Sequence, residues 1–352
     1  MFFWFFYYLK CIWNLLYRGK NPIIQQDSKI LRVNPHLSIC HVYGTYYTMG
    51  TQYGKAMHRR LTTDSDLFLE WMVANQAYFY KKMVIKNKNI FNALDELYTA
   101  NRTYYNQDVI NYMKGVSQGS GIPFKSLLFC NLFGDLMDNH CILLSKNIPG
   151  GRLNLRTLDY GCPQMSHCCT VFHPEGGYAY LSLNLSVLFG VFSGVSKKNV
   201  FFGESYYDLA VTPSDHLGMP FHHIAHKILA ESPDVQTAAR LLEKCKRQSN
   251  LQLLLADEST ARIYLSSDKM FILHQENEVE SVTPNEEKNF KLNSHYLDSI
   301  ENVIQNFIPR TKSGELHVLL THGSKLYISV TTDVFQSYNN TFYEYNLADL
   351  FG

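Results

Sequence analysis

The chain has 352 residues, of which 46% are hydrophobic and 18% charged, and its 32 basic and 31 acidic residues leave a formal net charge of +1. This is the composition of a globular protein that can bury a large core, in one large domain or two closely packed ones. A net charge near zero without a basic cluster argues against a nucleic-acid partner.

Eight cysteines are spread through apolar runs, without the close spacing of a disulfide framework or a zinc site. Cys168 and Cys169 follow His167. Adjacent residues of a strand point to opposite faces, so at most one of these two thiols can face a given site. We therefore expect mostly buried thiols, no metal and no cofactor.

Residues 1–17 are apolar and aromatic, apart from Lys10 and one asparagine, and basic residues follow at Arg18 and Lys20. The run is shorter than the ~20 residues that a spanning helix needs, and its charges follow it, unlike those of a signal peptide. Aromatic rings beside basic residues suit a membrane interface. We interpret residues 1–20 as a membrane-interface anchor, which favours a membrane-associated protein; the alternative is a helix packed on the protein's own core.

Residues 21–140 have mostly helical periodicity after an extended, proline-containing connector. The predicted helices cover 46–72, 90–97, 108–114 and 124–137, with a Gly- and Ser-rich loop over 117–123.

From residue 141 the periodicity becomes strand-like. The predicted strands cover 168–173, 179–185, 188–194, 199–206, 251–256, 261–265, 270–273, 316–320 and 326–330, and the predicted helices cover 221–230, 235–246 and 295–307. Strands inside and helices outside predict an α+β fold, with an antiparallel sandwich in 141–352 that the preceding helices wrap.

The strongest functional signal lies at Cys141, which opens an apolar run. The run ends at the Pro-Gly-Gly turn of residues 149–151, and the next apolar run carries Arg156 and Asp159. The two runs predict an antiparallel hairpin that returns a cation and a carboxylate to the thiol. Such an arrangement can orient a nucleophile and its base. A core cysteine beside a structural ion pair is the simpler alternative.

The same residues resemble a known family. A cysteine, a short strand, a turn and then Arg156-Thr157-Leu158-Asp159-Tyr160 is similar to the pattern of the cysteine N-terminal-nucleophile (Ntn) hydrolases, which include penicillin acyl-coenzyme A acyltransferase, acid ceramidase, N-acylethanolamine amidase and bile-salt hydrolase. Residues 41–54, 115–122 and 341–351 resemble segments of the acyltransferase-like branch, so the resemblance runs over most of the chain.

The resemblance implies an αββα sandwich of antiparallel sheets, formed by a catalytic part over 141–352 after a helical part over 21–140. It also implies that the chain cuts its own 140–141 peptide bond. The freed Cys141 then attacks an amide carbonyl, with its own α-amine as the general base.

The remaining roles follow from the resemblance too. Asp159 holds the α-amine, and Arg156 orients that carboxylate and the polar end of the substrate. Asn285, with a backbone N–H, stabilises the oxyanion; Asn293 is a rival for this role.

The chain departs from the family pattern on both sides of the cysteine. The family usually has Gly before it and Thr or Ser after it, whereas this chain has His140 and Ile142. The bulk of His140 can hinder the tight backbone geometry of self-cleavage, and a hydroxyl is lost at Ile142. An uncleaved Cys141 would have to use His140 as its base, although adjacent side chains on a strand diverge.

We therefore expect a cysteine amidohydrolase or acyltransferase that acts on the amide bond of a small N-acylated, hydrophobic molecule. Hydrolysis and acyl transfer share one acyl-thiol intermediate, so the sequence does not separate them. The alternative is a catalytically silent relative that binds lipid amides or a protein partner. A serine lipase is disfavoured because the sequence has no G-x-S-x-G elbow.

Overall fold

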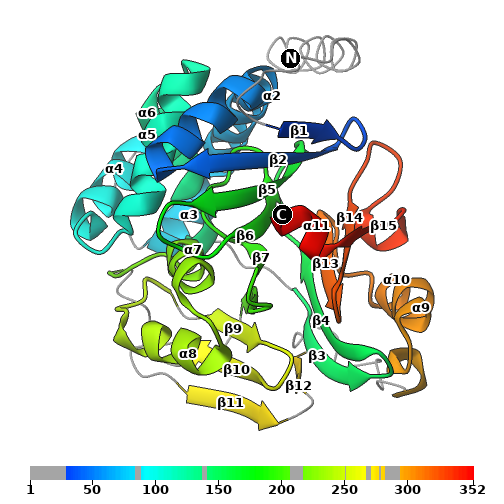
Figure 1. Ribbon diagram of the computed structural model, residues 1–352. Coiled ribbons are helices and arrows are strands. Elements are labelled where there is room, and N and C mark those ends of the chain that lie inside the picture. The colour runs from blue at the N-terminus through cyan, green and yellow to red at the C-terminus, as the bar shows by residue number, and fades with distance from the viewer. Residues whose placement is uncertain are drawn as a thin grey trace.

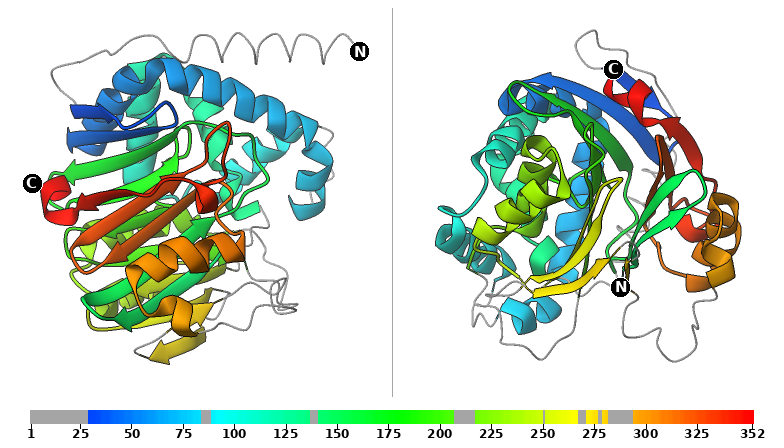
Figure 2. Two further views of the ribbon diagram at one scale, coloured as in Figure 1. Left: turned by 90° about the vertical axis from the view of Figure 1, so that its right-hand side faces the viewer. Right: turned by 60° about the horizontal axis from the view of Figure 1, so that its bottom comes forward.

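The computed structural model describes residues 29–83, 89–136, 141–206, 217–249, 251–266, 271–276, 279–281 and 294–352. These residues form a mixed helix-and-sheet fold with two β-sheets (Figures 1 and 2). The N-terminal segment 1–20, His140, Asn285 and Asn293 lie outside the described residues.

Sheet A has nine strands within the described ranges, in the order β1-β2-β5-β6-β7-β8-β9-β10-β11. Their bounds are Lys29–Arg32, Leu37–Gly44, His167–Pro174, Tyr180–Leu185, Ser193–Ser196, Phe201–Tyr206, Leu251–Ala256, Ala261–Ser266 and Phe271–Glu276. Neighbouring strands are antiparallel except β2 and β5, which pair in parallel.

The prediction that the strands of the sandwich come only from residues 141–352 and are all antiparallel is therefore wrong in two respects. β1 and β2 lie within residues 29–44, before residue 141, and the β2–β5 pairing is parallel. β2 belongs inside the molecule because it carries buried apolar side chains on both faces, Leu37 and Ile39 on one and Cys40 and Val42 on the other.

Sheet B has six strands in the described part of the chain, in the order β12-β3-β4-β13-β14-β15, all paired antiparallel. Their bounds are Val279–Ser281, Leu143–Ile148, Gly151–Leu158, His317–His322, Lys325–Val330 and Tyr343–Asn346. The predicted hairpin is confirmed: β3 and β4 pair around the Gly150–Gly151 turn, with Leu143 opposite Arg156.

Helices cover the outer faces of both sheets (Figure 1). The helices on the outer side of sheet A are α2 Tyr46–Ala74, α3 Gln76–Met83, α4 Ile90–Asn101, α5 Gln107–Ser120, α6 Phe124–Asn131, α7 Phe221–Glu231 and α8 Val235–Lys244, with the short η1 Gly134–Leu136 after α6. Sheet B is covered by α9 Ile300–Asn302, η4 Val303–Phe307 and α10 Ile308–Thr311, and the chain ends in α11 Leu347–Phe351. No helix among the described residues combines the length and apolarity needed to cross a bilayer.

Three clusters of buried apolar side chains hold these layers together. The first joins helices to sheet A, the second joins the facing sides of the two sheets, and the third joins sheet B to α9, η4 and α10. Members of these clusters from facing layers are Val116 with Phe172, Leu183 with Leu319, and Leu155 with Phe307.

The loop predicted over 117–123 is largely wrong, because α5 continues to Ser120. Its glycines lie where α5 crosses α2. A Cβ at Gly115 would lie 2.1 Å from the carbonyl oxygen of Tyr47, and one at Gly50 would lie 2.0 Å from that of Tyr112. Gly119 of the predicted loop packs in the same way, since a Cβ there would lie 2.3 Å from the carbonyl oxygen of Thr51, and the helix ends only at Gly121, where φ is +77°.

Two other elements differ from their predictions. The strand expected over 188–194 is displaced to β7, because the backbone bends at Gly190, where φ is +91°. The helix expected over 295–307 is interrupted after η3 Ser294–Leu297 and runs on to Thr311. There Ser299 accepts a hydrogen bond from the N–H of Asn302 (3.2 Å) and starts a new helix.

Candidate functional site

The open end of the β3–β4 hairpin brings the predicted nucleophile Cys141 to the backbone of Asp159. Cys141 lies two residues before β3 and Asp159 directly after β4. The backbone N–H of Asp159 lies 3.5 Å from the Sγ of Cys141, within the range of a weak hydrogen bond to sulfur. The Cys141 side chain is fully buried.

Arg156 lies on the face of sheet B that meets sheet A, and its ion-pair partner is a residue that the sequence analysis did not single out. The guanidinium pairs with the carboxylate of Glu204 on β8, and its Nε also donates to the carbonyl oxygen of Glu204 (3.3 Å). Both side chains are fully buried. Tyr160 donates its hydroxyl to the same carboxylate at 3.0 Å.

Asp159 is fixed by the loop that precedes β13. Its carboxylate accepts hydrogen bonds from the N–H of Gly314 (2.7 Å), the N–H of Glu315 (2.5 Å) and the hydroxyl of Ser313. Burial raises the pKa of Asp159, and these three hydrogen bonds together with Arg156 oppose the rise. The carboxylate is thus a positioned group beside the thiol and not the ion-pair partner of Arg156.

The thiol is not activated in the intact chain. Burial raises the pKa of Cys141 well above its ordinary value, Arg156 lowers it, and Glu204 and Asp159 raise it further. A buried thiol between two carboxylates and one guanidinium stays protonated at neutral pH, so nucleophilic attack needs an added base.

Sheet A also holds the backbone of Cys141. Its carbonyl oxygen accepts a hydrogen bond from the hydroxyl of Ser205 on β8 (2.8 Å).

His317 on β13 contacts Arg156 from another side. Its Nε2 lies 3.5 Å from the guanidinium of Arg156 and 2.8 Å from the hydroxyl of Ser193. Burial, His167 and Arg156 lower the pKa of His317, so it stays neutral and accepts from the guanidinium.

Glu204 had one sequence signal, a lone carboxylate inside an apolar strand. A buried carboxylate needs a buried cation, and Arg156 is such a cation, so the pair can be proposed from residue types alone. Ser313 and Ser205 gave no comparable signal, because isolated serines occur in many strands and loops. Asn285 and Asn293 lie outside the described residues.

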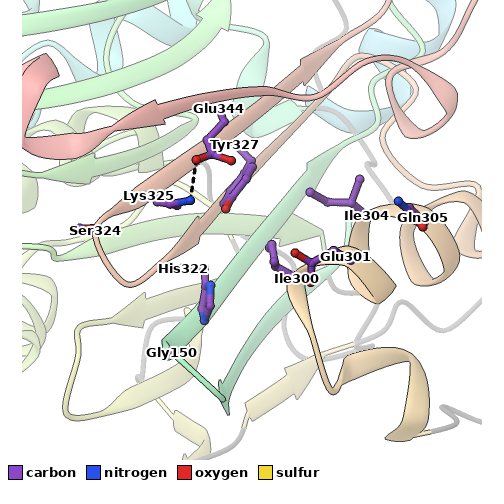
Figure 3. A pocket seen from close by; sticks show the side chains of 10 residues that line it. All are labelled: Gly150, Ile300, Glu301, Ile304, Gln305, His322, Ser324, Lys325, Tyr327 and Glu344. Atoms are coloured by element: carbon purple, nitrogen blue, oxygen red, sulfur yellow. Dashed lines mark ion pairs between the residues drawn. The ribbon is translucent and has the colours of Figure 1, made fainter.

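A pocket of about 470 Å³ lies at the other end of the hairpin, between the outer face of sheet B and α9 with η4 (Figure 3). On its sheet side, Lys325 of β14 and Glu344 of β15 form an ion pair of 2.7 Å, with Tyr327 beside them (Figure 3). It reaches the hairpin at the Gly150 turn and contains none of the residues around Cys141.

Comparison with known proteins gives distant relatives. No family model matches the chain. Over 276 residues, 70% of the chain, it is 23% identical to Protein dcd1A of Dictyostelium discoideum, and over 213 residues, 55% of the chain, it is 26% identical to Protein dcd1B of the same organism. The aligned parts span 62% and 42% of those proteins, so the chain covers less than two thirds of the length of either relative.

Among solved structures, similarity is found to a mutant of conjugated bile acid hydrolase from Clostridium perfringens, with a TM-score of 0.39 and 11% identity over 60% of this chain and 94% of that one. A second variant of the same enzyme has a TM-score of 0.34 and 10% identity, covering 61% of this chain and 87% of that one. With TM-scores below 0.5, these likenesses do not assign a fold or an activity to the chain.

Proposed function

We propose that the chain is a cysteine Ntn-type amidohydrolase or acyltransferase in which Cys141 attacks the amide carbonyl of an N-acylated, hydrophobic small molecule. The observation that carries the proposal is the contact between Cys141 and Asp159 at the open end of the hairpin, with Arg156 buried beside them. The resemblance implies that Arg156 orients Asp159, whereas here Arg156 pairs with Glu204 and the loop before β13 holds the carboxylate of Asp159.

The charge balance of the site supports a free α-amine at Cys141. The charged groups around the thiol are the buried Arg156 and Glu204 and the half-buried Asp159, which sum to −1 when both carboxylates are ionised. An uncompensated buried charge is costly, and an α-ammonium at residue 141 would neutralise it. Cleavage of the 140–141 bond creates that group beside Asp159.

The same amine supplies the base that the thiol lacks. A free α-amine ordinarily has a pKa of about 8, so near neutral pH a fraction is free to take the thiol proton. The thiolate attacks the amide carbonyl, the acyl group is carried on sulfur, and the amine returns the proton to the leaving nitrogen. Water or a second amine then releases the acyl group.

The order of layers also supports the proposal. Two facing sheets with helices on both outer faces agree with an αββα sandwich, to which the part before residue 141 contributes β1 and β2 as well as helices. Asn285 remains our proposed oxyanion donor, with Asn293 as its rival. We also propose that residues 1–17 attach the protein to a membrane surface, since their aromatic and apolar character suits one.

The test uses a fluorogenic amide, N-lauroyl-7-amino-4-methylcoumarin, with the full chain and with Cys141→Ala, Asp159→Asn and Cys169→Ala. We expect the first two variants to lose hydrolysis while remaining folded. Cys169→Ala removes another fully buried thiol, on a strand of sheet A away from the hairpin, and should keep the activity. Hydrolysis by Cys141→Ala would refute the nucleophile assignment.

A second candidate function is a silent relative that binds lipid amides or a protein partner. The full burial of Cys141 and its raised thiol pKa favour this alternative. A folded chain that neither hydrolyses the probe nor becomes labelled at Cys141 by an amide-mimicking electrophile would establish it over the enzyme.

A further inference from the structure

A chain of hydroxyl groups links the two sides of the Cys141 site. The N–H of Ile142 donates to the hydroxyl oxygen of Thr157 on β4 at 2.8 Å. That oxygen lies 2.5 Å from the hydroxyl of Ser313, and Ser313 donates to the carboxylate of Asp159. Thr157 is 0% and Ser313 3% exposed, so this series of hydrogen bonds runs through the protein interior.

The chemistry of these groups fixes which one donates and which one accepts in each hydrogen bond of the series. An ionised carboxylate only accepts hydrogen bonds, so Ser313 must direct its single proton to Asp159. The Ser313 oxygen then accepts from Thr157, and the Thr157 oxygen accepts from the N–H of Ile142. Every link is therefore set once Asp159 is ionised, and aligned hydrogen bonds in series strengthen one another.

The first link also shapes the strand. Leu143 faces Arg156 as the last regular pair of the β3–β4 ladder. One residue earlier, Thr157 donates its N–H to the carbonyl oxygen of Ile142 (3.2 Å) while its side chain receives the N–H of Ile142. Thr157 thus holds both polar backbone groups of the residue that follows Cys141.

We propose that Thr157 and Ser313 are positioning residues of the Cys141 site, which couple the backbone that carries the nucleophile to the carboxylate that holds its amine. This inference rests on the proposed function. It also accounts for the missing hydroxyl at position 142, because hydroxyls from Thr157 and Ser313 occupy the space between Ile142 and Asp159.

The consequence for the reaction is twofold. Hydrogen bonds to the ionised form favour the charged carboxylate, so loss of the Ser313 donor raises the pKa of Asp159 further. Activity that needs ionised Asp159 is then lost at a higher pH as the solution is made acidic. Loss of the Thr157 hydroxyl also frees the backbone at Ile142, which moves the thiol relative to its amine.

The test compares Thr157→Val, which removes the hydroxyl at nearly constant shape, with Thr157→Ser, which keeps it, and adds Ser313→Ala. The matched control is Thr321→Val, because Thr321 is a buried threonine of sheet B whose hydroxyl accepts from Asn154 (3.2 Å). Two quantities are measured: the pH profile of kcat and KM for the coumarin amide, and the amide hydrogen exchange of Ile142.

For Thr157→Val and Ser313→Ala we expect kcat to fall about tenfold or more, with KM nearly unchanged and the acidic limb of the kcat/KM profile displaced to higher pH. Exchange at Ile142 should accelerate about tenfold in Thr157→Val. Thr157→Ser should keep the wild-type pH profile and the wild-type exchange at Ile142, and so should Thr321→Val.

Two outcomes overturn the inference in distinguishable ways. If the wild-type chain is active but Thr157→Val has the same pH profile and exchange as Thr321→Val, the positioning role is refuted and the proposed function stands. If the wild-type chain does not hydrolyse the amide, the proposed function is refuted, and the positioning role is refuted with it.

Discussion

The ion pair between Arg156 and Glu204 joins the two sheets in the interior, because Arg156 belongs to β4 of sheet B and Glu204 to β8 of sheet A. Both side chains have no exposed surface. Gly203, next to Glu204, faces Arg156 so closely that a Cβ there would lie 2.8 Å from its Cγ. The pair therefore lies where the two sheets are in close contact, and its contribution to stability can be tested apart from activity.

Removal of one partner should cost much more than removal of both. Glu204→Leu leaves a buried guanidinium without its counter-charge, and such changes cost about 3–5 kcal/mol. The double variant Arg156→Met/Glu204→Leu removes both charges and should unfold at a higher urea concentration than either single variant. Urea unfolding followed by circular dichroism measures the free energy of unfolding of the wild type, both single variants and the double variant. Equal or additive losses in the double variant would show that charge compensation does not dominate this contact.

The crossing of α2 and α5 gives a prediction whose sign is informative. In an exposed helix, Gly→Ala stabilises by about 1 kcal/mol. At Gly115 the new Cβ would lie 2.1 Å from a backbone oxygen that cannot move aside cheaply, so Gly115→Ala should instead destabilise the protein by about 1–3 kcal/mol or more. Gly161→Ala is the control, because a Cβ there meets no atom within 4 Å. A stabilised Gly115→Ala variant would contradict the close crossing.

Local sequence patterns predicted the parts of the fold that local forces determine. The β3–β4 hairpin and α2 follow from periodicity and a glycine turn. The parallel pairing of β2 with β5 does not, because nothing local shows that residues over a hundred positions apart will pair. The extension of α5 was missed for a related reason: its glycines act through a partner helix.

The site shows the same division. The spacing of Cys141, Arg156 and Asp159 along one hairpin is a local feature, and the hairpin brings the thiol to the backbone N–H of Asp159. Glu204 and Ser313 reach them from β8 and from the loop before β13, so their positions depend on the packing of sheet A on sheet B and on the pairing of β13 with β4. Sequence spacing alone could not supply these two residues.

Asp135, in η1 just before the segment that leads to Cys141, predicts a dependence of stability on pH. Burial raises its pKa to about 7, although hydrogen bonds from the hydroxyl of Ser249 and the N–H of Phe221 oppose the rise. The imidazole of His222 lies 3.9 Å away. Since an unfolded aspartate has a pKa near ~3.9, the folded state alone holds this proton between about pH 4 and 7.

The free energy of unfolding should therefore decrease as the pH rises through that window, by up to about 4 kcal/mol from this group. The contribution is fully present below the unfolded pKa and is lost as the pH passes the folded one. Asp135→Asn cannot ionise, so its free energy of unfolding should lack this part of the pH dependence. Relative to the wild type, the variant should therefore be more stable at pH 8 than at pH 5. Urea unfolding at several pH values measures it, and identical slopes in the two proteins would show that Asp135 does not titrate as described.

Processing at Cys141 is the prediction on which the mechanism depends most. Ser205 of sheet A holds the carbonyl of Cys141, and Thr157 of sheet B holds the N–H of Ile142. A new N-terminus at residue 141 would therefore stay in place between the sheets, and the N-terminal piece would stay attached through the core that joins helices to sheet A. We expect mass spectrometry to find two associated pieces, the second beginning at Cys141, and Cys141→Ala to remain one chain.

His140→Gly should accelerate this cleavage, because a small residue removes the bulk next to the scissile bond. An intact chain of 352 residues with full amidase activity would refute the α-amine as the base and leave Cys141 as the nucleophile. A cleaved chain without activity would instead show that processing takes place and that a later step is blocked. The two results differ in both mass and turnover, so one preparation of each protein decides between them.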